Sequence, residues 1–188
     1  MNLIIFGPPG AGKGTQADFI VNKFNLYKLS TGEVLRNEIK NKTELGQKIS
    51  SIINSGSFVS NDIVKELVEL FISNNKYKDR LIFDGYPRNL IQAKTLNELL
   101  NKYDQKIDLV LKLSVSLETI KKRILERQTL EKRADDREEI AIKRYKTYEK
   151  STEPVIEFYK KLNLLKVIDG ERSIDQINKE ISDIIGLI

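Results

Sequence analysis

The chain has 188 residues, a formal net charge of +5 and neither cysteine nor histidine. This composition excludes disulfides, zinc sites built on thiolates or imidazoles, a cysteine nucleophile and a histidine base. The length predicts one domain, 1–188, and the 32 basic against 27 acidic residues form no basic block that would favour nucleic acid. No run approaches the roughly 18 apolar residues of a membrane span or forms a signal peptide, so we expect a cytoplasmic protein with no membrane or nucleic-acid partner.

A glycine-rich stretch follows the first apolar run. Residues 7–15 read G-P-P-G-A-G-K-G-T, between a short strand predicted at 3–6 and a helix with Ala17 and Ile20 on its apolar face. Glycine N–H groups can surround phosphate oxygens, while a helix N-terminus and a lysine add positive potential. The spacing therefore predicts a phosphate-binding loop for a nucleoside triphosphate, with Lys13 on the outer phosphates.

The loop departs from the common pattern at one position. The residue after Lys13 is Gly14, and the hydroxyl comes one place later, at Thr15. We therefore expect magnesium to be held mainly by phosphate oxygens and water. A flexible glycine turn between strand and helix is the alternative reading of the stretch.

A strand-free block follows the second predicted strand, 27–30. A hydroxyl, a glycine and an acid at 31–33 begin one short helix, and a second runs through Leu45 and Ile53 to a polar loop. The block, 30–59, reads as a helical insertion packed beside the sheet and as a candidate mobile flap.

The third strand, 81–83, ends in Asp-Gly-Tyr-Pro-Arg. An acid at the end of an apolar strand can orient a metal and its waters beside phosphates, so Asp84 is the candidate magnesium residue, acting through water. Strands also end commonly in Asp-Gly turns, which is the alternative for Asp84.

After a helix starting near Leu90, the fourth strand, 109–113, leads into a helix with Arg123 and Arg127 on one face. Two cations four residues apart repel each other unless they share an anion, although both could simply face solvent.

A further helix is expected to begin at 134–136 and to give way to a new one at Thr152-Glu153-Pro154. We assign its aromatic residues, Tyr148 among them, to packing and not to ligand binding. The fifth strand, 165–168, precedes a last helix opened by a capping box at Ser173. Five strands alternating with helices predict an α/β, three-layer fold with a parallel sheet and its site at the carboxyl ends of the strands.

Five motifs together resemble the nucleoside monophosphate kinases, and most closely the adenylate kinases. They are G-P-P-G-A-G-K-G-T, L-S-T-G-E-V-L-R, D-G-Y-P-R with a glutamine four residues later, R-I-L-E-R, and R-A-D-D before a second arginine. The resemblance covers essentially the whole chain. It implies reversible, magnesium-dependent phosphoryl transfer from ATP to AMP, giving two ADP, by a monomer with an AMP-binding insertion at 30–59.

The resemblance also implies roles for individual residues. The ATP-binding residues would be Gly10, Ala11, Gly12, Lys13, Gly14, Thr15, Arg127 and Arg172, the last through its backbone. The AMP-binding residues would be Thr31, Arg36, Ser57, Phe58, Val59, Gly85, Tyr86, Pro87, Arg88, Gln92, Arg133 and Arg144, with Gln92 reading the base. The residues around the transferred phosphoryl group would be Lys13, Arg88, Arg123, Arg133 and Arg144.

One departure from the family concerns the lid, 126–136. Many bacterial members carry a longer segment here, sometimes with four zinc ligands, whereas only five residues separate Arg127 from Arg133. The chain therefore resembles the short-lid form without zinc. The competing readings are a UMP or CMP kinase, a small-molecule kinase of another P-loop family, and a catalytically silent P-loop protein. Asn89 weakly resembles the asparagine in the base-reading region of the UMP and CMP kinases, whereas Thr31 and Gln92 resemble the AMP-specific members.

Overall fold

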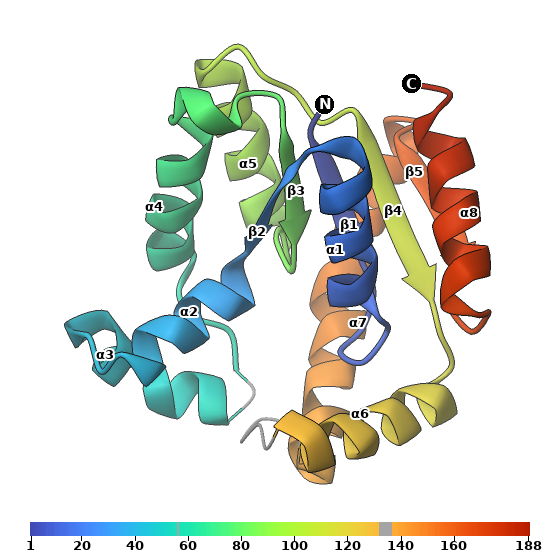
Figure 1. The fold of residues 1–188 in the computed structure, drawn as a ribbon. Helices are drawn as coiled ribbons and strands as arrows, with labels where there is room; N and C mark the ends of the chain where they lie inside the picture. The colour runs from blue at the N-terminus through green and yellow to red at the C-terminus, as the bar shows by residue number, and fades with distance from the viewer. Residues whose placement is uncertain (56, 132–136) are drawn as a thin grey trace.

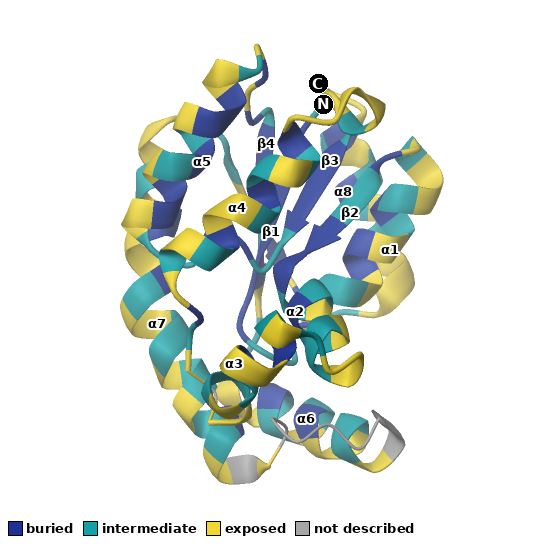
Figure 2. Ribbon diagram, turned by 90° about the vertical axis from the view of Figure 1, so that its left-hand side faces the viewer, coloured by how far each residue is buried: buried dark blue, intermediate teal, exposed yellow. Residues whose placement is uncertain are grey.

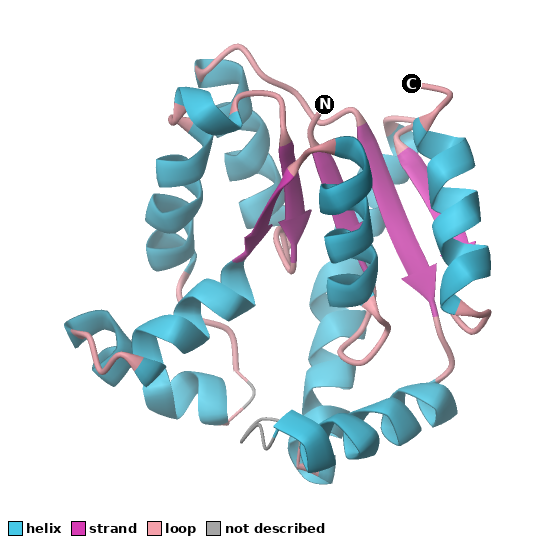
Figure 3. Ribbon diagram, in the orientation of Figure 1, coloured by secondary structure: helices cyan, strands magenta, loops and turns pink. Residues whose placement is uncertain are grey.

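The computed structural model of the chain describes residues 1–55, 57–131 and 137–188. Its middle layer is a five-stranded sheet in the order β2-β3-β1-β4-β5, in which every neighbouring pair is parallel. The strands are β1 (Leu3–Phe6), β2 (Tyr27–Ser30), β3 (Leu81–Asp84), β4 (Leu109–Ser114) and β5 (Leu165–Asp169). The helices are α1 (Lys13–Phe24), α2 (Thr31–Lys40), α3 (Glu44–Asn54), α4 (Asn61–Ile72), the 3₁₀ turn η1 (Asn75–Tyr77), α5 (Leu90–Lys102), α6 (Leu117–Glu131), α7 (Glu138–Lys161) and α8 (Ile174–Ile185). The predicted α/β fold with a parallel sheet is confirmed (Figure 3).

Helices cover both faces of the sheet, because its central strands are apolar on both sides. On β1, Ile4 and Phe6 face a core shared with α4, α5 and α7, whereas Leu3 and Ile5 face a second core shared with α1 and α8. Figure 2 shows these two helical layers on either side of the buried strands. The sheet is therefore buried on both faces, and its carboxyl edge carries the loops.

The insertion, 30–59, lies beyond this carboxyl edge (Figure 1). It contains α2 and α3, and its described residues form no strand after Ser30. The two helices pack closely at Gly46, where an added Cβ would lie 2.1 Å from the carbonyl oxygen of Glu38. The expected helical content is present, and the insertion's role as a nucleotide-binding unit stays a prediction.

The prediction of a new helix at residues 152–154 is wrong. α7 continues without a break from Glu138 to Lys161 and contains Pro154. Proline removes one helical hydrogen bond, but Val155, Ile156 and Tyr159 directly after it are almost fully buried against the sheet. We infer that this packing keeps the helix continuous through the proline position.

The predicted lid, 126–136, is described only in part. α6 carries its first residues and ends at Glu131, and α7 begins at Glu138. The helix start expected at 134–136 lies outside the described residues. Across the residues that are described, no helix is both long and apolar enough to cross a membrane.

Candidate functional site

Two cavities open at the carboxyl edge of the sheet. The inner cavity lies between α2, the residues before α4, the end of β3 and α7. The outer cavity runs along the glycine loop and the first turns of α1, past α6, to the residues after β5.

The structure brings the predicted site residues together in two groups. The inner cavity is lined by every predicted AMP-binding residue that the structure describes: Thr31, Arg36, Ser57, Phe58, Val59, Gly85, Tyr86, Pro87, Arg88, Gln92 and Arg144. The outer cavity is lined by the predicted ATP-binding residues and by two further candidates: Gly10, Ala11, Gly12, Lys13, Gly14, Thr15, Asp84, Arg123, Arg127 and Arg172. Arg133 lies outside the described residues, so its predicted role stays a prediction.

Four cations lie where the two cavities meet. Lys13, Arg36, Arg88 and Arg144 line both of them. They come from α1, α2, the loop after β3 and α7, so the parallel sheet and its crossovers gather them from distant parts of the chain. Such a junction would hold charge-dense anionic groups brought in from both sides.

The glycine loop is shaped by its backbone. Gly12, the residue before α1, has φ +91°, a conformation that side-chain-bearing residues rarely adopt. This turn leads the chain into α1, whose first residues, Lys13, Gly14 and Thr15, line the outer cavity. Lys13 folds back over the loop, and its Nζ donates to the carbonyl oxygens of Gly7 (2.8 Å) and Pro8 (3.0 Å).

The Lys13 ammonium group is electrostatically strained. The pKa of Lys13 is lowered to about 8, mainly by burial, with the nearby guanidinium groups of Arg88, Arg144 and Arg127 acting in the same direction and the Asp84 carboxylate opposing them. A phosphate placed beside Lys13 would relieve this repulsion, because it would add negative charge next to the ammonium group.

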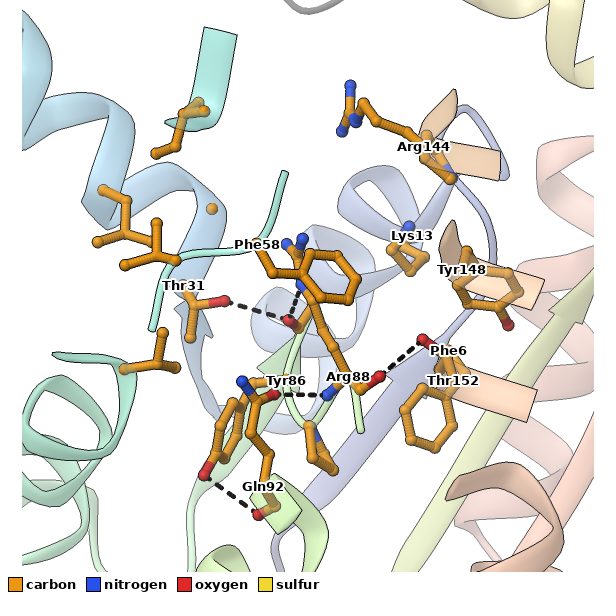
Figure 4. Close-up of a pocket in the computed structure, with 18 of the residues that line it drawn as sticks. Phe6, Lys13, Thr31, Phe58, Tyr86, Arg88, Gln92, Arg144, Tyr148 and Thr152 are labelled. Atoms are coloured by element: carbon orange, nitrogen blue, oxygen red, sulfur yellow. Dashed lines mark hydrogen bonds between the residues drawn. The ribbon is translucent and has the colours of Figure 1, made fainter. Parts of the chain in front are cut away.

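The carbonyl oxygen of Gly85 links the insertion to the loop after β3. It accepts hydrogen bonds from Thr31 Oγ1 (3.2 Å) and from Arg88 Nε (2.7 Å), as Figure 4 shows. The Arg88 guanidinium also stacks 5.1 Å from the centre of the Phe58 ring. Arg88 is therefore oriented by groups from both walls of the inner cavity.

Gln92 forms the floor of the inner cavity. Its side chain is only 3% exposed, and its Oε1 accepts from the backbone N–H of Arg88 at 2.7 Å. The Tyr86 hydroxyl donates to the Gln92 carbonyl oxygen at 3.2 Å, and burial raises the pKa of that hydroxyl above its usual range. The polar groups of this wall are thus ordered by the protein itself.

The arginines of the outer cavity bind backbone and acidic side chains. Arg123 donates to the carbonyl oxygens of Gly170 (3.0 Å) and Ala11 (3.4 Å), so it ties α6 to the glycine loop and to the residues after β5. Arg172 is paired with Glu180. A side chain held in this way fits the expectation that Arg172 would use its backbone toward a nucleotide.

Asp84 lies at the end of β3 and faces the outer cavity. Its carboxylate has no ion pair or hydrogen bond with the part of the chain that the structure describes, and no group of three or more acidic residues surrounds it there. One free carboxylate beside a phosphate-binding loop suits Mg²⁺, which keeps several waters and takes other ligands from phosphate oxygens. The residues present therefore fit that ion.

Sequence reasoning missed two polar side chains of the inner cavity. Tyr148 and Thr152 line it from α7, and the Thr152 hydroxyl donates to the Arg88 carbonyl oxygen at 3.1 Å. From the sequence, Tyr148 is assigned to packing alone, whereas the structure places it at the cavity wall. The signal was their spacing, because Arg144, Tyr148 and Thr152 are four residues apart and share one face of a continuous helix.

Comparison with known proteins identifies the family. The adenylate kinase family model matches residues 5–164. An adenylate kinase of Pelagibacter ubique (strain HTCC1062) is 47% identical over 211 aligned positions, covering 98% of this chain and 99% of the relative. An adenylate kinase of Fusobacterium nucleatum subsp. nucleatum is 38% identical over 208 positions, covering 99% of each. An adenylate kinase of Flavobacterium psychrophilum is 37% identical over 186 positions, covering 98% of each.

The lengths of these alignments separate two kinds of relative. Those of 211 and 208 positions exceed the 188 residues of this chain, so those two relatives contain segments that this chain lacks, whereas the Flavobacterium relative has a similar length. The family model, the near-complete coverage and a cation-lined junction on a P-loop sheet agree, and the chain belongs to the adenylate kinase family.

Proposed function

We propose that this protein is an ATP:AMP phosphotransferase that binds AMP in the inner cavity and MgATP in the outer cavity. The observation that carries the proposal is the junction of Lys13, Arg36, Arg88 and Arg144, where a phosphate from each side would meet. Membership of the adenylate kinase family supports the same reaction. Transfer is reversible and converts MgATP and AMP into two ADP.

The chemistry needs positioning and positive charge more than a strong base. An oxygen of the AMP phosphate attacks the terminal phosphorus of ATP while the bond from that phosphorus to the bridging oxygen breaks, and ADP leaves on the far side. Lys13 contacts the phosphoryl group during its transfer. Arg88 and Arg144 bind the acceptor phosphate and stabilise the charge that develops, and Arg127 binds on the ATP side. Arg123 holds the wall of the outer cavity in place, and Arg133 is proposed to join the phosphates on the evidence of its motif alone.

Mg²⁺, held beside Asp84 through water, would neutralise the phosphate oxygens of ATP. No zinc site is proposed, because the chain has no cysteine or histidine. We further propose that the protein works as a cytoplasmic monomer on ATP, AMP and ADP.

AMP selection is assigned to Gln92 and Thr31. Gln92 offers an amide donor and an acceptor toward the N1 and 6-amino edge of adenine, and Thr31 lines the same cavity. Asn89, the residue that weakly favoured a pyrimidine enzyme, caps α5 by accepting from the Gln92 backbone N–H at 2.9 Å. This structural use of Asn89 favours AMP over UMP or CMP as the acceptor.

The test is coupled ADP formation with AMP, CMP, UMP and GMP. We expect AMP to exceed each of the others by at least about a hundredfold in kcat/KM, because a wrong base leaves buried polar groups unpaired at roughly 1 to 3 kcal/mol each. Gln92→Ala should reduce this preference more than it reduces the best attainable rate. Equal kcat/KM for AMP and CMP would contradict the proposal and favour a pyrimidine kinase.

A further inference from the structure

Three side-chain amides meet at one oxygen beneath the inner cavity. Asn61, the first residue of α4, accepts at its Oδ1 from Gln92 Nε2 (2.9 Å) and from Asn89 Nδ2 (3.1 Å). These residues lie 31 and 28 positions apart in the chain. The contact therefore joins the start of α4, directly after the insertion, to the residue proposed to read the acceptor base.

Two backbone donors define which way these amides face. The Arg88 N–H can only donate, so the Gln92 atom beside it, at 2.7 Å, must be the oxygen. The Gln92 N–H likewise requires the oxygen of Asn89, at 2.9 Å. Both NH₂ groups then point to Asn61, which must present an acceptor.

This arrangement opposes a flip of the Gln92 amide. A flip would place Nε2 against the Arg88 N–H and Oε1 against the Asn61 oxygen, so that donor would face donor and acceptor would face acceptor. A glutamine free to flip can match adenine, with an acceptor at N1 and an amino group at C6, or hypoxanthine, with a donor at N1 and an oxygen at C6. A glutamine held in one orientation can match only one of these edges.

We propose that Asn61 is a positioning residue for base selection, which holds Gln92 in the orientation that accepts adenine and rejects a 6-oxopurine. The inference rests on the proposed function, since it concerns the acceptor base. It adds a specificity-determining residue that does not itself touch the base. An aspartate at position 61 would keep the acceptor oxygen, whereas an alanine would remove it.

The experiment compares AMP with inosine monophosphate, because their bases differ only at the N1 and C6 edge. We expect Asn61→Ala to lower the ratio of kcat/KM for AMP to that for inosine monophosphate by at least about fivefold, as fits the loss of one buried hydrogen bond. Asn61→Asp should keep this ratio within about twofold of the parent value. The KM for ATP should stay unchanged in both variants.

Two controls separate positioning from a general structural effect. Asp62→Ala, at the exposed neighbouring residue, should leave the ratio unchanged. In a double-mutant cycle, Asn61→Ala added to Gln92→Ala should change the ratio no further, because its effect passes through Gln92. If the alanine variant does not fold, Asn61→Ser, whose side chain is too short to reach Gln92, takes its place.

An unchanged ratio in a folded Asn61→Ala protein overturns the inference, and so does an equal loss of the ratio with and without Gln92. Those results would leave the proposed function standing as long as the parent protein makes ADP from AMP. A parent protein that makes no ADP from AMP and ATP would instead overturn the proposed function, and the inference with it.

Discussion

The inner and outer cavities are built in different ways. In the inner cavity, polar side chains such as Thr31 and Gln92 are 3% exposed and already hydrogen-bonded to the protein. In the outer cavity, the glycine loop forms part of the wall, and Arg123 and Arg172 are engaged with carbonyl groups or acidic side chains.

This difference indicates which of the two cavities can distinguish one nucleotide base from another. Ordered side chains can distinguish one base edge from another, whereas backbone N–H groups and a helix N-terminus recognise phosphate irrespective of the base. We therefore expect the inner cavity to set which monophosphate is accepted. The junction of cations should instead set the rate.

The largest effect is expected at the junction. Lys13→Met should abolish phosphoryl transfer, because it removes the charge beside the transferred group while leaving the backbone of the loop intact. The melting temperature should stay the same or rise, since a partly buried cation is lost. Coupled kinetics and thermal melting measure the two effects.

Lys28→Met is the matched control for Lys13. Lys28 lines the outer cavity too, but its ammonium group is paired with Asp18 at 2.6 Å and Glu33 at 3.4 Å. Its loss should change turnover little. Near-normal turnover in a folded Lys13→Met protein would show that Lys13 is not the catalytic cation.

Substitutions of the arginines should have the next largest effect on turnover. Arg88→Ala and Arg133→Ala should each lower turnover by at least roughly a hundredfold, because each would meet charge that develops during transfer. Arg123→Ala should also be severe, since it frees α6 from the glycine loop. Lys121→Ala, on another face of α6, should be nearly silent, and effects confined to KM would contradict the assignment.

A substitution in the insertion should affect the binding of AMP in the inner cavity and not the binding of ATP in the outer cavity. Gly46→Ala would place a Cβ 2.1 Å from the Glu38 carbonyl oxygen, which should cost about 1 to 3 kcal/mol and shift α3 against α2. We expect a higher KM for AMP with little change in the KM for ATP, whereas Ser51→Ala on the exposed side of α3 should change neither. Equal increases in both KM values would show that the cavities are not independent.

The smallest effect is expected from removing zinc. Activity should require magnesium, whereas a zinc-selective chelator should change neither the melting temperature nor the rate, because the chain has no cysteine or histidine to hold zinc. Loss of stability on chelation would contradict this reading of the lid.

Much of the fold and site was predictable because short apolar strands end in chemically marked residues. The run before Gly7 and the one before Asp84 are both buried strands, and their carboxyl ends lie next to each other in the sheet, with Ile5 paired with Asp84. Parallel strands bring such ends to one edge, so local motifs predict a common site. The position of these residues directly after apolar strands was therefore enough to predict that they share one site.

Contacts between distant segments were not predictable. The link from Asn61 to Gln92 has no local signature, because an asparagine at a helix start is ordinary in itself. The continuity of α7 through Pro154 depends on buried neighbours that only the folded sheet supplies. That continuity in turn places Tyr148 and Thr152 on the face of Arg144, which a helix broken at residue 152 would not do.

The lowered pKa of Lys13 couples the binding of nucleotide to the uptake of protons. A pKa of about 8 means that the free ammonium group begins to lose its proton just above neutral pH, whereas a bound phosphate would raise that pKa. Nucleotide should therefore bind with net proton uptake between about pH 8 and 9, and more weakly as the pH rises. Calorimetric titration in two buffers of different ionisation enthalpy would reveal this uptake as a buffer-dependent heat, and Lys13→Met should remove it. The residue that would steady the transferred phosphate would then also act as a proton acceptor when ATP arrives.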